Sequence, residues 1–134
     1  MIILVCGLPG SGKSTDAGKI ARRLGIEVIS TDKIRKSIFK QGSFEEIKNS
    51  ESPEDYDLQI LSESDDPIPD EWQSVIWKQS DVVYNTLLDL IEKSLSSGKS
   101  IIVDATLYKK DFRQMIYRIA ESFGTKAYII ECFA

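Results

Sequence analysis

The chain has 134 residues, of which 42% are hydrophobic and 28% charged, with two cysteines, no histidine and a formal net charge of −4. This length is enough for one domain with a buried core. No apolar run approaches the roughly 18 residues of a membrane-spanning helix. Two cysteines cannot form a disulfide framework. The lack of histidine excludes catalysis by a histidine base and metal sites with histidine ligands. We therefore expect a cytoplasmic protein with no membrane partner.

Segments with strand and helix patterns alternate along the chain. Continuous apolar, β-branched runs predict strands at 2–6, 26–30, 101–104 and 126–132. Apolar residues at helical spacing predict helices at 13–24, 32–39, 72–95 and 109–123. This alternation predicts an α/β domain spanning residues 1–134, in which a parallel sheet carries helices on both faces.

The charge is unevenly distributed. From Ser43 to Glu71 there are eleven acidic residues and one base, Lys48, so this segment carries −10 and the remainder of the chain +6. Residues 41–70 also contain three prolines and little periodicity, which predicts an acidic irregular insertion of the kind that often serves as a lid or binding loop. The mildly basic remainder suits a phosphate-bearing partner.

A phosphate-binding pattern follows the first predicted strand. Residues 7–14 read G-L-P-G-S-G-K-S and fit G-x-x-x-x-G-K-[ST]. The candidate nucleotide-binding residues are Gly7, Pro9, Gly10, Ser11, Gly12, Lys13, Ser14 and Thr15. Glycines let backbone N–H groups approach phosphates, Lys13 places a cation on the β- and γ-phosphates of ATP, and the Ser14 hydroxyl can ligate Mg²⁺. The alternative is a glycine-rich turn with a surface lysine.

Acidic residues follow two further predicted strands. Asp32, after the second strand, is a candidate general base, and Arg35, one helical turn later, is a candidate ligand for a substrate phosphate. Alternatively, Asp32 only caps its helix. Asp104 ends the third strand and is a candidate for holding Mg²⁺ or its water shell, as opposed to a plain turn residue.

Three motifs together resemble one family. The combination G-L-P-G-S-G-K-S-T, S-T-D-x-I-R and I-I-V-D-A-T is similar to the small P-loop kinases of the polynucleotide 5'-hydroxyl kinase and seryl-tRNA kinase group. The resemblance implies a P-loop NTPase three-layer sandwich with strand order 2-3-1-4-5. It also implies that Lys13 and Ser14 serve ATP and Mg²⁺, and that Asp104 lies beside the phosphate loop. Asp32 would act as general base, and the implied acceptor contacts are Asp32, Arg35, Thr106 and Arg113.

The sequence departs from this family at three places, one of which is an acidic segment longer than the family leads us to expect. Leu107 stands where many members have asparagine, and no arginine follows Arg118. Members normally continue after the fourth strand into an arginine-bearing lid and a fifth strand. We therefore expect a C-terminally truncated domain with a four-stranded sheet in the order 2-3-1-4. Alternatively, the arginine comes from another subunit or catalysis is weak.

The motifs predict an ATP- and Mg²⁺-dependent kinase that transfers the γ-phosphoryl group to a hydroxyl. The acceptor could be a nucleic-acid end (RNA or DNA), an aminoacyl-tRNA or a small metabolite. Two alternatives stay open, namely a non-catalytic nucleotide-binding switch module and a toxin-like nucleotide-sugar kinase.

Overall fold

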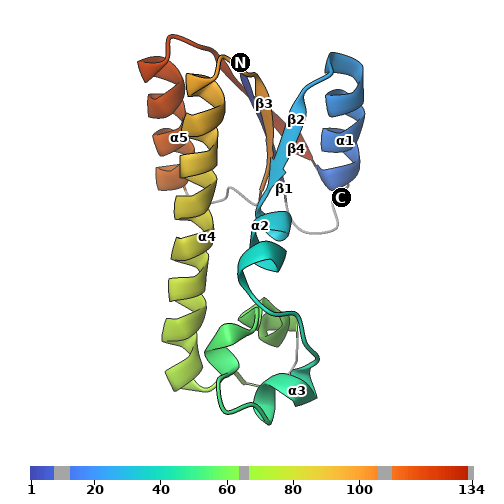
Figure 1. Cartoon of the computed structure of the whole chain (residues 1–134), viewed down its shortest axis with the longest axis vertical. Coiled ribbons are helices and arrows are strands. Elements are labelled where there is room, and N and C mark those ends of the chain that lie inside the picture. The colour runs from blue at the N-terminus through green and yellow to red at the C-terminus, as the bar shows by residue number, and fades with distance from the viewer. Residues whose placement is uncertain (8–12, 64–66, 106–109, 133–134) are drawn as a thin grey trace. The chain divides into compact units, whose positions relative to one another are not determined.

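A computed structural model of the chain describes residues 1–7, 13–63, 67–105 and 110–132 (Figure 1). The chain divides into two compact units. The first, here called the sheet unit, comprises Met1–Thr31 and Thr86–Ala134, and the second, the helical unit, comprises Asp32–Asn85. The helical unit is therefore larger than the insertion at 41–70 that the sequence predicted.

The sheet unit contains four parallel strands in the order β2-β3-β1-β4, which confirms the predicted order. They are β1 (Ile2–Gly7), β2 (Glu27–Ser30), β3 (Ile101–Asp104) and β4 (Ala127–Cys132). Ile2 of β1 pairs in register with Ile101 of β3 and Ala127 of β4. The sheet therefore has the topology expected of an α/β P-loop NTPase.

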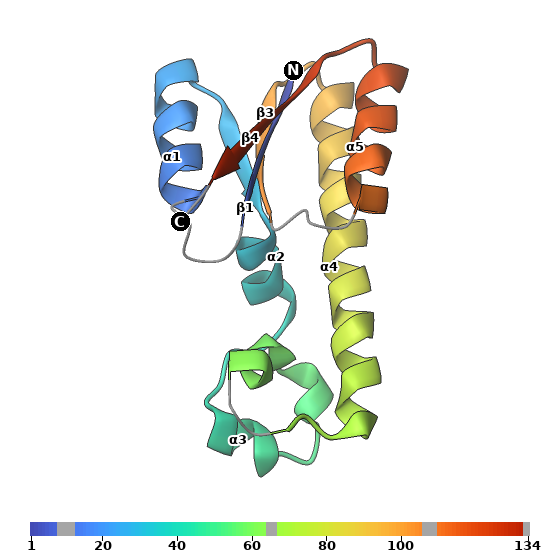
Figure 2. The same cartoon turned by 180° about the vertical axis from the view of Figure 1, so that it is seen from behind.

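Helices cover both faces of this sheet, as Figures 1 and 2 show. Helix α1 (Lys13–Leu24) lies on one face, while α5 (Lys110–Ser122) and the second half of α4 (Asp70–Ser96) lie on the other. Beneath α1, Ala17 packs with Ile3, Val5 and Ile102. Because both faces are covered, β1 and β3 carry continuous apolar runs in place of an alternating pattern.

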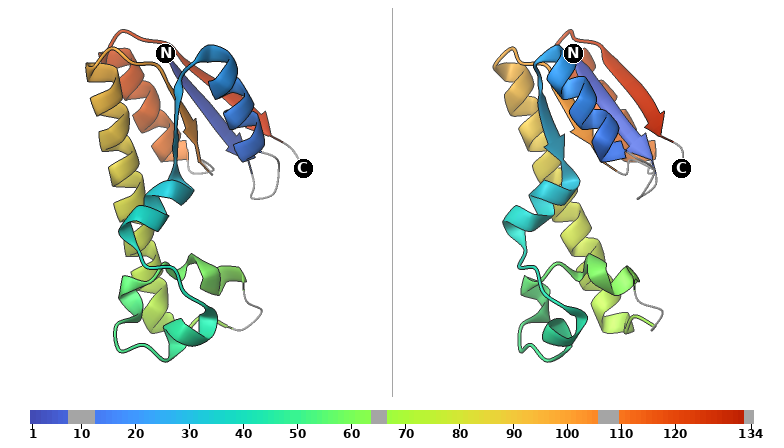
Figure 3. Two further views of the ribbon diagram at one scale, coloured as in Figure 1. Left: turned by 45° about the vertical axis from the view of Figure 1, so that its right-hand side comes forward. Right: turned by 90° about the vertical axis from the view of Figure 1, so that its right-hand side faces the viewer.

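The helical unit is more ordered than the sequence predicted. It contains α2 (Thr31–Ile38), α3 (Phe44–Lys48), the 3₁₀ helices η1 (Pro53–Asp55) and η2 (Leu58–Glu63), and the first half of α4 (Figure 3). The first residue of α2, Thr31, still belongs to the sheet unit. Short helices therefore occupy part of the segment 41–70 that the sequence predicted to be irregular. Ser43 and Glu46 form a capping box that starts α3, with the Glu46 N–H donating to the Ser43 hydroxyl at 3.2 Å.

A small apolar core holds these short helices together. Ile47, Leu58 and Leu61 are buried, and partly buried side chains of Phe44 and Trp72 pack against them. This core is built from three separated positions rather than from a periodic run, which explains why it is hard to recognise in the sequence. Within the described residues, no helix is both long and apolar enough to cross a membrane.

Candidate functional site

The carboxyl edge of the parallel sheet brings together the start of the phosphate-binding sequence and the helix that follows it. Gly7 ends β1 with a φ of 156°, a value that glycine adopts without a steric penalty. Lys13 and Ser14 begin α1, and Thr15 is exposed in the same first turn. The backbone N–H groups of this turn carry the positive end of the helix dipole, which favours binding of an anion.

Part of the predicted loop lies outside the described residues. This applies to Pro9, Gly10, Ser11 and Gly12, and also to the side chains of Lys13 and Ser14. The predicted contact Thr106 lies outside them as well. Their assignment to nucleotide and acceptor binding therefore stays a prediction from the sequence pattern.

Asp104 lies on the strand next to β1. It ends β3, pairs in register with Val5 of β1 and Ser30 of β2, and is 6% exposed. The N–H of Ala105 donates to the Val5 carbonyl at 3.3 Å, so the chain stays alongside β1 past the end of β3. A buried acid is thus held one strand away from the point where β1 enters the phosphate-binding sequence.

These residues fit a nucleotide with Mg²⁺. In the part of the chain that the structure describes, no three or more Asp, Glu, Cys or His residues form a metal-binding group. Mg²⁺ commonly takes one or two protein oxygens and fills its remaining positions with water and phosphate oxygens. Asp104 and the predicted Ser14 ligand would make such a site, whereas Ca²⁺ or a transition metal would need more protein ligands.

Asp32 lies in the first turn of α2 and belongs to the helical unit. Its side chain is exposed. Because α2 begins at Thr31, Asp32 is the second residue inside the helix and not the residue before it, where an N-cap would stand. An exposed carboxylate at this position is accessible to solvent and can exchange a proton with a bound molecule.

Arg35 is held by two other residues of the helical unit. Its Nη1 lies 3.7 Å from Oδ1 of Asp57, and its Nη2 donates to the Ser80 hydroxyl at 3.4 Å. The Arg35 and Asp57 side chains are only 12% and 14% exposed. No sequence pattern indicates this arrangement, since Asp57 is one of eleven acids in its segment and Ser80 follows no motif. Arg113, the other predicted acceptor contact, lies partly buried in the first turns of α5.

The sequence matches a family model described as "AAA domain" over residues 2–134, which is nearly the whole chain. A comparison with curated protein sequences gave no significant match.

Three solved structures share the fold. The first is a candidate kinase from Chloroflexus aurantiacus, with 20% identity and a TM-score of 0.54; the match covers 98% of this chain and 58% of that one. The second is a sugar kinase from Janibacter sp. HTCC2649, with 22% identity, a TM-score of 0.53 and coverage of 98% of this chain and 58% of that one. The third is a gluconokinase from Sinorhizobium meliloti 1021, with 21% identity, a TM-score of 0.50 and coverage of 97% of this chain and 55% of that one. The chain therefore spans a little over half the length of each of these proteins. At these identities the likeness supports the fold alone.

Proposed function

The chain belongs to the AAA domain family, and from that premise we propose that it is an ATP- and Mg²⁺-dependent kinase whose acceptor group is a hydroxyl. One observation carries this proposal. The sequence G-x-x-x-x-G-K-S runs from the end of the buried strand β1 to the first turn of α1, with Asp104 on the adjacent strand. A strand, a glycine-rich loop and a helix N-terminus in this order make a phosphate-binding site.

Each predicted residue has a defined task in this proposal. Lys13 neutralises charge on the β- and γ-phosphates, and Asp104 and Ser14 hold Mg²⁺, which supplies further charge neutralisation when bound. Asp32 orients the acceptor hydroxyl and takes its proton. A bond forms between the acceptor oxygen and the γ-phosphorus while the bond from that phosphorus to the bridging oxygen breaks, leaving ADP.

Among hydroxyl acceptors, we favour a small metabolite over a nucleic-acid end or a tRNA. The net charge of −10 between Ser43 and Glu71 repels a polyanion. Arg35, our candidate acceptor contact, already has its charge balanced by Asp57 at 3.7 Å, which weakens its attraction for a phosphate group. The names of two structural neighbours, a sugar kinase and a gluconokinase, point in the same direction.

The test is a transfer assay with γ-labelled ATP and Mg²⁺ on the full chain. The acceptor panel contains sugars and polyols, a nucleotide sugar, 5'-hydroxyl oligonucleotides and tRNA. We expect label on a sugar or polyol, and we expect Lys13→Ala to lower the rate by about 100- to 1,000-fold, the usual effect of removing one group that stabilises transition-state charge. Lys19→Ala is the matched control, because Lys19 is an exposed lysine on the same helix.

The possible results separate the alternatives. Binding of ATP without transfer to any acceptor contradicts the kinase proposal and favours a nucleotide-binding switch. Transfer to the nucleotide sugar alone supports the toxin-like kinase. Transfer to an oligonucleotide or tRNA alone keeps the kinase but overturns the choice of a small acceptor.

A further inference from the structure

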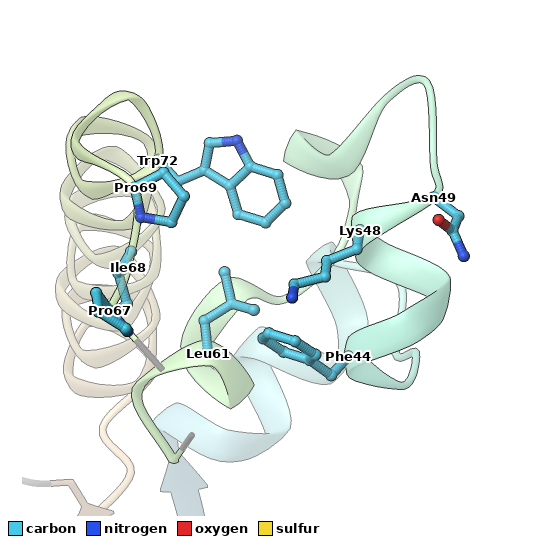
Figure 4. Close-up of a pocket in the computed structure, with 8 residues that line it drawn as sticks. All are labelled: Phe44, Lys48, Asn49, Leu61, Pro67, Ile68, Pro69 and Trp72. Carbon is cyan, nitrogen blue, oxygen red and sulfur yellow. The ribbon is translucent and has the colours of Figure 1, made fainter. Parts of the chain in front are cut away.

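A cavity of about 420 Å³ opens in the helical unit, and none of the described residues that line it is assigned to phosphate transfer (Figure 4). Its volume falls in the range of about 300–1,000 Å³ that is usual for small-molecule sites. The described residues that line it are Phe44, Lys48 and Asn49 from α3 and its end, Leu61 from η2, Pro67, Ile68 and Pro69 before α4, and Trp72 from the first turn of α4.

The walls of this cavity are held in place by the packing around them. Leu61 is 3% exposed and belongs to the core of the helical unit, against which Phe44, Ile68 and Trp72 pack. The backbone N–H of Trp72 donates to the Pro69 carbonyl at 3.0 Å, and this hydrogen bond fixes the start of α4. A site whose walls are already ordered loses less conformational entropy when a ligand binds.

Two aromatic side chains reach the cavity from different helices. Figure 4 shows the indole of Trp72 extending from α4 and the ring of Phe44 extending from α3, with Leu61 between them. Aromatic side chains offer large apolar faces and edges that pair favourably with another planar ring. The apolar part of the cavity therefore suits a planar aromatic ligand.

Lys48 gives this apolar cavity its charge. Its ammonium lies 4.2 Å from the centroid of the Phe44 ring, and Figure 4 shows the side chain directed toward Phe44 and Leu61. Lys48 is the single base between Ser43 and Glu71, yet within the described part of the chain no carboxylate pairs with it and no acidic residue lines the cavity.

Among the described residues that line the cavity, Lys48 is the charged one, and its positive charge favours an anionic ligand. An anionic group beside the aromatic ring would gain a direct contact with the ammonium, and a cationic group would be repelled.

We propose that this cavity is a binding site for a small planar aromatic anion and is built from residues that have no part in the proposed kinase reaction. The proposal does not depend on the kinase activity, because every residue it uses lies in the helical unit and none is assigned to phosphate transfer.

The test compares three probes that share one ring system and differ in charge: 1-naphthoate, 1-naphthylmethanol and 1-naphthylmethylamine. Binding to the Trp77→Phe variant of the chain is followed by Trp72 fluorescence and by calorimetry, since Trp77 is 57% exposed and does not line the cavity. We expect naphthoate to bind about fivefold more tightly than the neutral alcohol, the upper end of the effect of one exposed charge pair, and the amine to bind most weakly.

Variants at two exposed lysines test whether Lys48 causes the preference for an anionic probe. Lys48→Ala should bring the affinities for naphthoate and the alcohol within twofold of each other, and Lys48→Glu should make the amine the best ligand. Lys78 is an exposed lysine on α4 that does not line the cavity, so Lys78→Ala should leave the order of the three affinities unchanged.

The proposal is overturned if no probe binds below millimolar concentration, if the amine binds best to the parent chain, or if the order of affinities survives Lys48→Ala. Lys13→Ala should bind the probes normally, so a failure of the kinase proposal is distinguishable from a failure of this one.

Discussion

The side-chain amide of Gln79 donates a 2.6 Å hydrogen bond to the backbone carbonyl of Tyr56. The same amide nitrogen donates to the Glu54 carbonyl at 3.2 Å, and the amide oxygen accepts from the Leu58 N–H at 3.1 Å. Gln79 is only 4% exposed. One buried side chain on α4 therefore satisfies three backbone groups of the acidic segment and ties that segment to the helix.

Replacing Gln79 should destabilise the helical unit. Gln79→Met keeps the size of the side chain but leaves buried backbone groups unpaired, each at a cost of roughly 1–3 kcal/mol. We expect the free energy of unfolding to fall by about 3 kcal/mol. Urea unfolding followed by tryptophan fluorescence reports on this unit, because Trp72 and Trp77 both belong to it.

Gln73→Met is the matched control, since Gln73 is exposed on the same helix. It should change the free energy of unfolding by no more than about 0.5 kcal/mol. Equal stabilities of the two variants would contradict the role assigned to Gln79.

The contrast between the two units explains how much of the fold the sequence could predict. In the sheet unit, local patterns determine the elements: the apolar run at 2–6 is covered on both faces, and the helix predicted at 13–24 has the same bounds as α1. In the segment 41–70 of the helical unit, the capping box of Ser43 and Glu46 is a local signal, whereas other order depends on contacts with distant positions, such as Tyr56 with Gln79. No local pattern signals such a contact, so the segment is predicted to be irregular.

The contact between Arg35 and Asp57 should contribute to the stability of the same unit. Both side chains are largely buried, so Asp57→Leu alone leaves a poorly solvated guanidinium, and we expect a loss of about 2 kcal/mol. In the double variant Arg35→Met, Asp57→Leu, the loss should be smaller than the sum of the single losses by about 1 kcal/mol. A double-mutant cycle on urea unfolding measures this difference. Additive losses would show that the two charges do not interact.

The candidate site was predictable where it follows from a motif and a strand end. The phosphate-binding pattern places Lys13 at the start of a helix, and a parallel strand carries Asp104 to the same sheet edge as Gly7. The surroundings of Arg35 were not predictable, because its partner Asp57 lies 22 residues later in the sequence, in a segment without periodicity. The sequence also gave no indication of the cavity between α3 and α4.

Two glycines give opposite expectations for substitution by alanine. A Cβ atom on Gly42 would lie 2.7 Å from Cε1 of Tyr56, whose carbonyl is already fixed by Gln79, so Gly42→Ala should cost about 1–3 kcal/mol. Gly18, inside α1, has no atom of the described residues within 4 Å of the same position, so Gly18→Ala should gain about 0.5–1 kcal/mol from helix propensity. Thermal unfolding followed by circular dichroism measures both changes. A stable Gly42→Ala variant would mean that the Tyr56 ring moves aside freely.

Asp104 should matter for the metal and not for the sheet. Asp104→Asn keeps the shape of a side chain that is 6% exposed, so we expect the thermal midpoint to change little. It removes the negative charge that would hold Mg²⁺, and loss of such a metal contact typically costs about 10- to 100-fold in metal affinity or activity. The Mg²⁺ concentration for half-maximal transfer should therefore rise by a factor in that range. Asp89→Asn, at an exposed acid on α4, serves as control and should leave it unchanged. An unaltered Mg²⁺ requirement in Asp104→Asn would remove Asp104 from the metal site, because its charge would then have no effect on metal binding.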